Sequence, residues 1–106
     1  MAKYLFHGSY TVDGIRGVRR EGGTGRVQAV SALAQSVGGS IESFYFAFGG
    51  DDFYVVVDLP DNTRAAAVAT AVAASGAVNL TTAVLLSPEE VDAAAKVDVT
   101  YRAPGT

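Results

Sequence analysis

The clearest alternation of hydrophobic and polar positions lies in residues 40–59, SIESFYFAFGGDDFYVVVDL. Apolar or aromatic residues recur at every second position on both sides of Gly49–Asp52, a run of turn-forming residues. This pattern predicts two strands and a tight connection, in which we expect Gly49 to adopt, or to neighbour, a conformation closed to residues with a Cβ. Residues 44–48, FYFAF, place large aromatic side chains on both faces of the first strand.

Periodicity elsewhere predicts two more strands, two long helices and one short helix. The expected strands are Lys3–Tyr10 and Ala77–Leu86, and the expected helices are Val12–Val37, Thr63–Ser75 and Pro88–Lys96. The next residues, Val97–Tyr101, are compatible with a fifth strand or an arm, and a frayed tail is expected from Arg102 onward.

Capping residues precede each expected helix. Thr11 and Asp61 can accept hydrogen bonds from first-turn amides, and Ser87 is followed by proline and two acids. Residues Gly22–Gly25 interrupt the first helix, and Thr24 can cap its second piece. Because an interrupted helix packs irregularly on a sheet, we expect a gap beside this break.

The element order β-α-β-β-α-β indicates an α+β fold of the ferredoxin-like kind. It has a four-stranded antiparallel sheet with two long helices on one face, plus a short C-terminal helix and arm. The other face is left without helices, although the strands carry apolar residues on both sides. Soluble monomers avoid large exposed apolar patches, so we expect a homodimer or higher homo-oligomer packed through this face.

The size and charge of the chain exclude several classes of protein. Its 106 residues suffice for a single domain, 1–106, and 49% apolar residues argue against disorder. The net charge of −3 has the wrong sign for a nucleic-acid or anionic-membrane partner. There is no cysteine, and the N-terminus lacks the apolar run of a signal peptide. A cytoplasmic location is the default expectation.

Several segments together resemble the GYD-domain family. They are Tyr10–Thr11, Glu21–Gly23, Ser43–Gly49 followed by Asp52, Val57–Asn62, Ser75–Val78 and Leu85–Val91. The resemblance covers nearly the whole chain and implies a ferredoxin-like fold related to the dimeric α+β barrels, with no settled function. Asp51 stands where the tyrosine that names the family motif would lie.

Two acids and one histidine are candidates for chemistry. Asp51 and Asp52 can bind a cation or transfer protons, but turn formation is the simpler interpretation; Asp52 can also orient a group at the sheet end. His7, the only histidine, can carry a proton with Tyr45 or Tyr54, or be a satisfied core or interface residue. No histidine spacing typical of a metal site is present, so neither a metal nor a cofactor is expected.

Arginines surround the glycine-rich break. Arg20 and Arg26 can hold a phosphate or carboxylate, or can simply be solvated beside a helix kink. The break lacks the Gly-Lys-Ser/Thr of a Walker loop and does not follow a strand as a dinucleotide-binding loop does. A nucleophile elbow and the aromatic RNA-binding motif are also absent from the sequence.

These observations favour a homo-oligomeric module that binds a small molecule between the sheet and the helices. We expect the ligand on the helix-facing side, close to His7 and Gly22–Gly25, with Arg20 and Arg26 favouring an anionic or carbonyl-bearing molecule. Tyr54 is expected among the nearest hydrogen-bonding groups. By analogy with dimeric α+β barrels, the alternative is a cofactor-independent enzyme of the monooxygenase or isomerase type. Convergence of His7, Tyr45, Asp52 and Tyr54 on one cavity would favour the enzyme.

Overall fold

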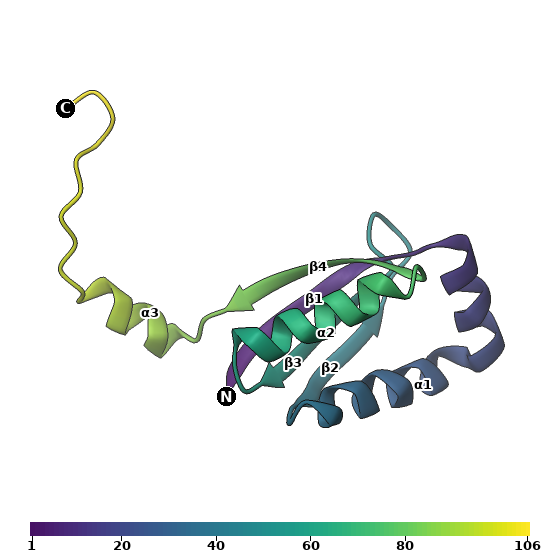
Figure 1. Cartoon of the computed structure of the whole chain (residues 1–106). Helices are drawn as coiled ribbons and strands as arrows, with labels where there is room; N and C mark the ends of the chain where they lie inside the picture. Colours follow the sequence, from purple (N-terminus) through teal and green to yellow (C-terminus); the bar gives the residue numbers. More distant parts are fainter.

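The computed structural model describes all residues 1–106 and places two long helices on one face of a four-stranded antiparallel sheet (Figure 1). The strands are β1 (Ala2–Tyr10), β2 (Ser40–Phe46), β3 (Phe53–Leu59) and β4 (Val78–Leu85); the helices are α1 (Val12–Ser36), α2 (Asn62–Ala74) and α3 (Pro88–Ala95). The strand order is β2-β3-β1-β4. The predicted ferredoxin-like α+β class is confirmed.

The helices begin at the predicted capping residues. The side chains of Thr11 and Asp61 accept hydrogen bonds from the amides of Gly14 and Arg64, and Ser87 forms a capping box with Glu90. The bond from the Arg64 amide is the main reason that the pKa of Asp61 is lowered. Short-range sequence signals therefore account for the helix starts.

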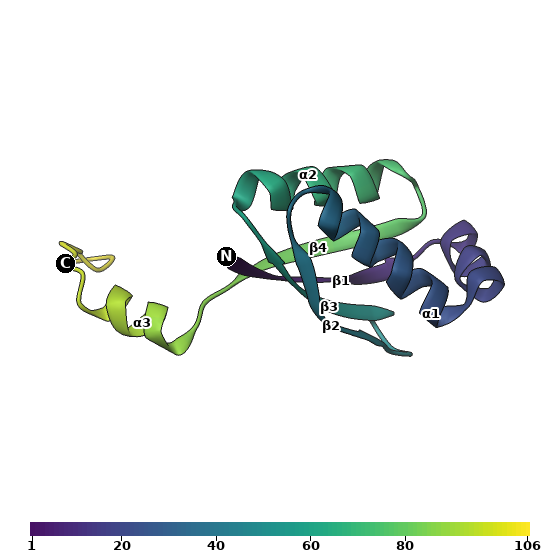
Figure 2. The same ribbon diagram turned by 90° about the horizontal axis from the view of Figure 1, so that it is seen from below.

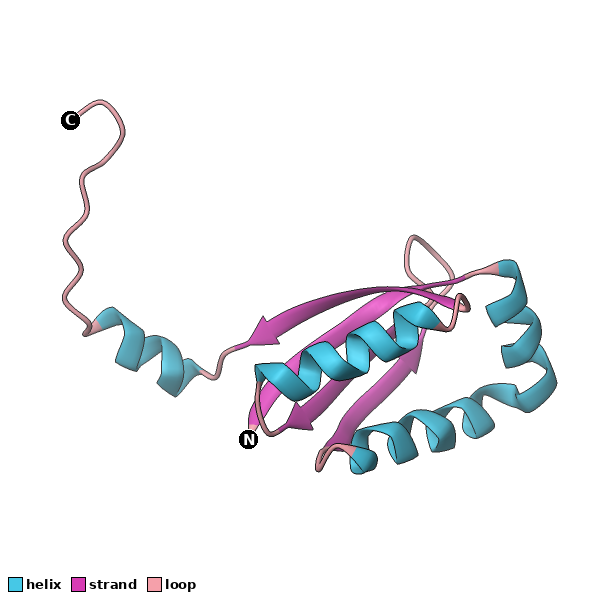
Figure 3. Ribbon diagram, viewed as in Figure 1, coloured by secondary structure: helices cyan, strands magenta, loops and turns pink.

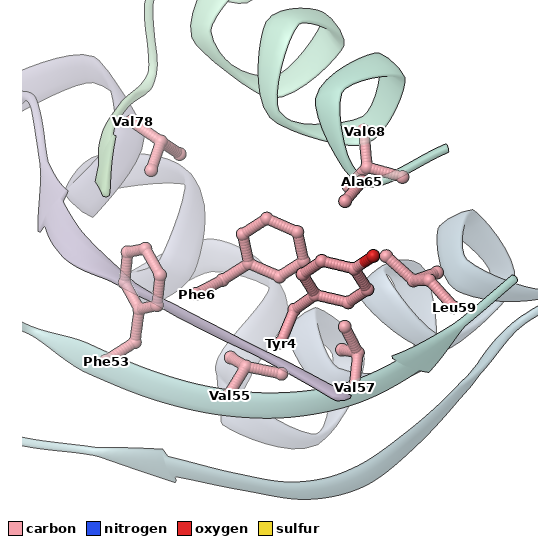
Figure 4. Close-up of a cluster of buried hydrophobic side chains, with 9 residues drawn as sticks. All are labelled: Tyr4, Phe6, Phe53, Val55, Val57, Leu59, Ala65, Val68 and Val78. Carbon is pink, nitrogen blue, oxygen red and sulfur yellow. The ribbon is translucent and has the colours of Figure 1, made fainter. Parts of the chain in front are cut away.

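The core forms where β1, β3, β4 and α2 meet (Figure 4). It contains Tyr4, Phe6, Phe53, Val55, Val57, Leu59, Ala65, Val68 and Val78. The hydroxyl of Tyr4, whose ring is buried, donates to Oδ1 of Asn62 at 2.6 Å. Burying each large apolar side chain contributes about 1.5–3 kcal/mol, so this layer fixes which sheet face the helices cover.

The strand period then determines where His7 lies. Tyr4 and Phe6 point into the core, so Leu5 and His7 project from the opposite face. Figure 2 shows α1 and α2 on the same side of the sheet and no helix on the other. The expectation that a helix-side pocket lies close to His7 is therefore wrong.

The connection between β2 and β3 also differs from the prediction. It is a loop held at its ends, where the amide of Ala47 donates to Asp52 O (2.9 Å) and that of Asp52 to Gly8 O (2.7 Å). Neither Gly49 nor Gly50 has a positive φ, and a Cβ on either would meet open space. The prediction of a restricted backbone conformation at Gly49 is therefore wrong, because a loop of this length turns without a residue in the left-handed conformation.

The C-terminal segment extends away from the sheet (Figures 1 and 3). All residues from Pro88 to Thr106 are exposed, and no strand forms in Val97–Tyr101. Of the two conformations considered for these residues, the chain adopts the arm, which contributes to a longest dimension of 56 Å. None of the helices combines the length and hydrophobicity needed to cross a membrane.

Candidate functional site

The kink in α1 leaves a gap between this helix and the sheet. At Gly22 the backbone leaves helical geometry, with φ 79° and ψ 167°. Figures 1 and 2 show the first half of α1 beyond the end of the sheet and the second half beside it. Near the bend, Gly23 packs against Phe46, since a Cβ on it would lie 3.3 Å from the ring. The helix interruption predicted at Gly22–Gly25 thus has a structural consequence.

Two adjoining hollows open in this gap, and their linings share five residues: Tyr10, Arg26, Leu33, Val72 and Val78. The outer one has a volume of about 380 Å³ and is bordered by α1, α2 and the loop before β4. The inner one, of about 50 Å³, is lined by twelve residues, eleven of them hydrophobic. Together they form what we call the helix-side cavity, within the size range of small-ligand sites.

Arg26 supplies the only charge in the inner lining. Its side chain is 27% exposed, and its nearest acidic partner, Glu21, lies 3.7 Å away. At that distance the pair is a loose contact and leaves guanidinium donors available for another acceptor. Arg20, in contrast, is exposed and does not line the helix-side cavity.

Tyr10 lies beside Arg26 and is half-buried. Its ring contacts Phe53, with centroids 5.2 Å apart. Burial raises the pKa of the phenol, and the positive charge of Arg26 opposes this shift in the pKa. The hydroxyl therefore remains protonated at neutral pH and can donate a hydrogen bond.

Asp52 has a structural role at the end of β1. Its Oδ2 accepts a hydrogen bond from the amide of Tyr10 at 3.0 Å. It also borders a further hollow of about 310 Å³ beside Tyr10, Ile15 and Phe46. The carboxylate thus fixes the backbone that carries Tyr10.

A second polar group lies on the opposite, helix-free face. Nδ1 of His7 donates to Oδ2 of Asp51 at 2.6 Å, and the ring of Tyr54 stacks on His7 with centroids 6.0 Å apart and 9° between planes. Tyr45 pairs with Tyr54 across β2 and β3. We call His7, Asp51, Tyr54 and Tyr45 the His7 cluster.

The predicted site residues therefore divide between two faces of the sheet. Arg26 and Asp52 border hollows on the helix side, Arg20 lies outside them, and His7, Tyr45 and Tyr54 belong to the His7 cluster. They do not converge on one cavity. No group of three or more His, Cys, Asp or Glu side chains is placed to hold a metal ion.

The sequence did not indicate Tyr10 as a cavity residue, and it indicated Asp51 as a candidate without its contact to His7. The strand pattern predicts that Tyr10 lies in the core. It lines the cavity instead because the kink in α1 leaves a gap beside it. The pairing of β1 with β3 carries the loop before Phe53 to the residues around Gly8, which brings Asp51 to His7. The contact between His7 and Asp51 follows from the sequence only if Gly8 is taken to pair with Phe53 in antiparallel strands.

Comparison with known proteins identifies a family. The family model described as GYD domain matches residues 4–95, from within β1 to the end of α3. No curated protein and no solved structure matches the chain.

Proposed function

Since the chain belongs to the GYD domain family, a membership that by itself specifies no reaction, we propose from its geometry that it is a homo-oligomeric binding protein. Its ligand is a small amphipathic anion held between the sheet and α1. The observation that carries this proposal is the inner part of the helix-side cavity, where eleven hydrophobic residues surround one guanidinium group, that of Arg26. The outer part also contains the carboxylates of Asp13 and Glu21, so the anion is expected at the inner end, beside Arg26.

The lining specifies two parts of the ligand. An apolar or aromatic body contacts the hydrophobic walls that α1, α2 and the strands contribute, and most of it lies in the outer hollow, because the inner one measures only about 50 Å³. A carboxylate, or a strongly polarised carbonyl, accepts hydrogen bonds from Arg26 and from the protonated hydroxyl of Tyr10. Charge-assisted bonds in a partly desolvated site are stronger than neutral ones, so the anion determines most of the selectivity.

Calorimetric titration with phenylacetate, indole-3-acetate and octanoate tests this proposal. Each acid is compared with its neutral amide, and the Arg26→Gln variant is expected to bind the acids about tenfold or more weakly. Arg20→Gln is the matched control, since it removes the same charge from the same helix outside the cavity. Equal affinities for acid and amide, or equal losses in the two variants, would contradict the proposal.

The helix-free face supports the oligomeric part. Leu5, Val56 and Ala83 form an apolar row across β1, β3 and β4. In the His7 cluster, the exposed ring of Tyr45 lies on β2 beside Tyr54 of β3. At one end Lys3 pairs with both Asp58 and Glu42 at 2.8 Å. An apolar centre with a charged border is typical of interfaces between copies.

The His7 cluster favours one alternative function, a cofactor-independent enzyme. With Nδ1 donating to Asp51, Nε2 carries the lone pair of the ring and can accept a proton. A base of this kind suits isomerisation, in which a proton leaves a carbon beside a carbonyl and returns at another position. A monooxygenase would in addition consume dioxygen as a co-substrate.

Proton exchange separates the two functions. In D₂O, an enzyme of the isomerase type would exchange the α-protons of aromatic ketones and keto acids, as followed by NMR, and His7→Gln would abolish the exchange. Arg20→Gln, remote from this face, would leave it intact. No exchange above the buffer rate would exclude this alternative.

A further inference from the structure

The two edges of the sheet are not alike. Edge strand β2 carries the charged Glu42 and a register irregularity between Ile41 and Ser43. Charges and bulges on an edge strand discourage further strand pairing. Edge strand β4, VNLTTAVL, has no charge and no proline, and its register with β1 is continuous from Val78 to Leu85. The free backbone groups of β4 are therefore an unprotected template for another strand.

A groove runs along this edge. Between β4 and α2 lies a hollow of about 330 Å³, because the facing residues of α2 are small. It is lined by Tyr4, Asn62, Ala65, Ala66, Ala69, Thr70, Thr82 and Val84. Val84 is 58% exposed there. A strand added beside β4 would project every second side chain toward this groove.

The arm has the matching pattern. Val97, Val99 and Tyr101 alternate with Asp98 and Thr100, and valine, threonine and tyrosine favour strands. The three apolar side chains are among the most exposed of the chain, from 63% to 76%. In this segment only Val97 forms a backbone hydrogen bond, with Ala94 at the end of α3. The arm thus has a β pattern and no β partner.

We propose that Val97–Tyr101 of one copy adds as a fifth strand to the free edge of β4 in a second copy, with its three apolar side chains facing the groove. This inference deepens the homo-oligomeric part of the proposed function and rests on it. Main-chain hydrogen bonds supply the affinity, and the groove beside α2 selects the face that the arm presents. The partner is another copy of this chain, because the arm of each copy matches the edge that each copy leaves free.

The arm is held away from the β4 edge of its own chain. To pair with that edge as an antiparallel strand, residues 97–101 would have to fold back along β4. Only residues 86–96 separate β4 from the segment, and α3 occupies most of them. Figure 1 shows α3 and the arm directed away from the sheet. A second copy has no such constraint.

Cross-linking between two single-cysteine variants tests the contact directly, because the natural chain has no cysteine. Thr82→Cys marks the groove side of β4, and Val99→Cys marks the apolar side of the arm. One variant is labelled with ¹⁵N, and the two are mixed and oxidised with diamide. Disulfide formation between the labelled and unlabelled chains is expected at several times the yield obtained with Gln28→Cys on the exposed surface of α1.

Three results would overturn the proposal. One is a yield no higher than that of Gln28→Cys, and another is a disulfide between two Val99→Cys chains in preference to the mixed one. The third concerns a variant that carries both Thr82→Cys and Val99→Cys. A disulfide that forms only within one chain of this variant would show that the arm pairs with its own β4.

Removal of residues 97–106 separates this proposal from oligomerisation in general. The shortened chain loses no sheet or core contact, and its dissociation constant in sedimentation experiments is expected to rise about tenfold or more. Amides of β4 should also exchange faster with D₂O. If neither the dissociation constant nor the amide exchange of β4 changes, the arm contact is wrong, whereas the proposed homo-oligomer is not contradicted. A full-length chain that is monomeric throughout would overturn both.

Discussion

At the residue scale, the glycines show how differently one residue type behaves in two places. A Cβ on Gly8 would lie 1.8 Å from the carbonyl oxygen of Asn79 on the neighbouring strand, whereas Gly49 faces open space. Gly8 is therefore required by the close approach of β1 and β4, and Gly49 is not required by any contact. A strand glycine that permits close backbone approach cannot be recognised from its immediate neighbours in the sequence.

The first prediction compares substitutions at these two positions. Gly8→Ala should lower the free energy of unfolding by about 3 kcal/mol or more, because the strands must move apart or the residue must strain. Gly49→Val should change it by less than about 0.5 kcal/mol. Urea unfolding of both variants measures the difference, and comparable losses would show that the loop is as constrained as the strand pair.

The second prediction concerns the titration of Tyr10. Burial raises its pKa above the ordinary value of 10.0, so the folded chain holds the phenolic proton more tightly than the unfolded chain. The contribution of this phenol to the free energy of unfolding is therefore fully present below pH 10.0, and it is lost as the pH rises through the folded-state pKa.

Near-ultraviolet absorbance of tyrosinate checks this direction. The difference between the titration of the natural protein and that of Tyr10→Phe should have its midpoint above pH 10.0. A difference midpoint at or below that pH would contradict a buried phenol at the cavity wall.

At the scale of elements, α1 is the helix whose shape determines the site. Its kink at Gly22 moves the first half past the sheet end and leaves the gap in which Tyr10 and Arg26 meet. A straight helix would pack regularly on the sheet and fill that gap with side chains. The glycines of α1 therefore shape the cavity, although none of them needs to contact the ligand.

The third prediction tests this role of Gly22. Gly22→Ala should reduce the free energy of unfolding by about 1 kcal/mol or more, because φ is positive there. Gly17→Ala is the matched control in the same helix: only the end of the Arg20 side chain comes within 4 Å of its Cβ position. The control should be neutral or stabilise by up to about 1 kcal/mol. If the two variants shift the thermal midpoint in the same direction, the kink is not maintained by Gly22.

At the scale of the whole molecule, the two faces of the sheet differ in what covers them. The helices bury one face, and the other presents Tyr45, 71% exposed, beside Tyr54 of the His7 cluster. Because Tyr45 contributes little to the core of its own chain, a charge there should affect association more than folding.

The fourth prediction is that Tyr45→Lys shifts the protein from the proposed homo-oligomer to a monomer at micromolar concentration, measured by light scattering after size exclusion. The thermal midpoint of the monomeric variant should differ little from that of the natural chain diluted until it too is monomeric. Gln28→Lys, an equal change of charge on exposed α1, should leave the mass unaltered. A natural chain of monomer mass under these conditions would contradict the interface.

Much of the fold could be predicted because it depends on local signals. The helix starts at Thr11, Asp61 and Ser87, the break at Gly22 and the succession of helices and strands along the chain all follow from neighbours a few residues apart. The site was predicted less well. Arg26 was placed beside a gap that exists, whereas His7 was assigned to that gap and lies on the other face.

The sequence by itself determined the element order, the caps, the kink and the presence of apolar residues on both faces of the sheet. The tertiary structure decided which face the helices cover, since this depends on Tyr4, Phe6 and the odd-numbered residues of β3 packing against α2. It also decided the contact of Asp51 with His7, 44 residues apart, and that of Tyr10 with Phe53. Strand alternation separates two faces but does not say which one meets the helices, because only long-range packing distinguishes them.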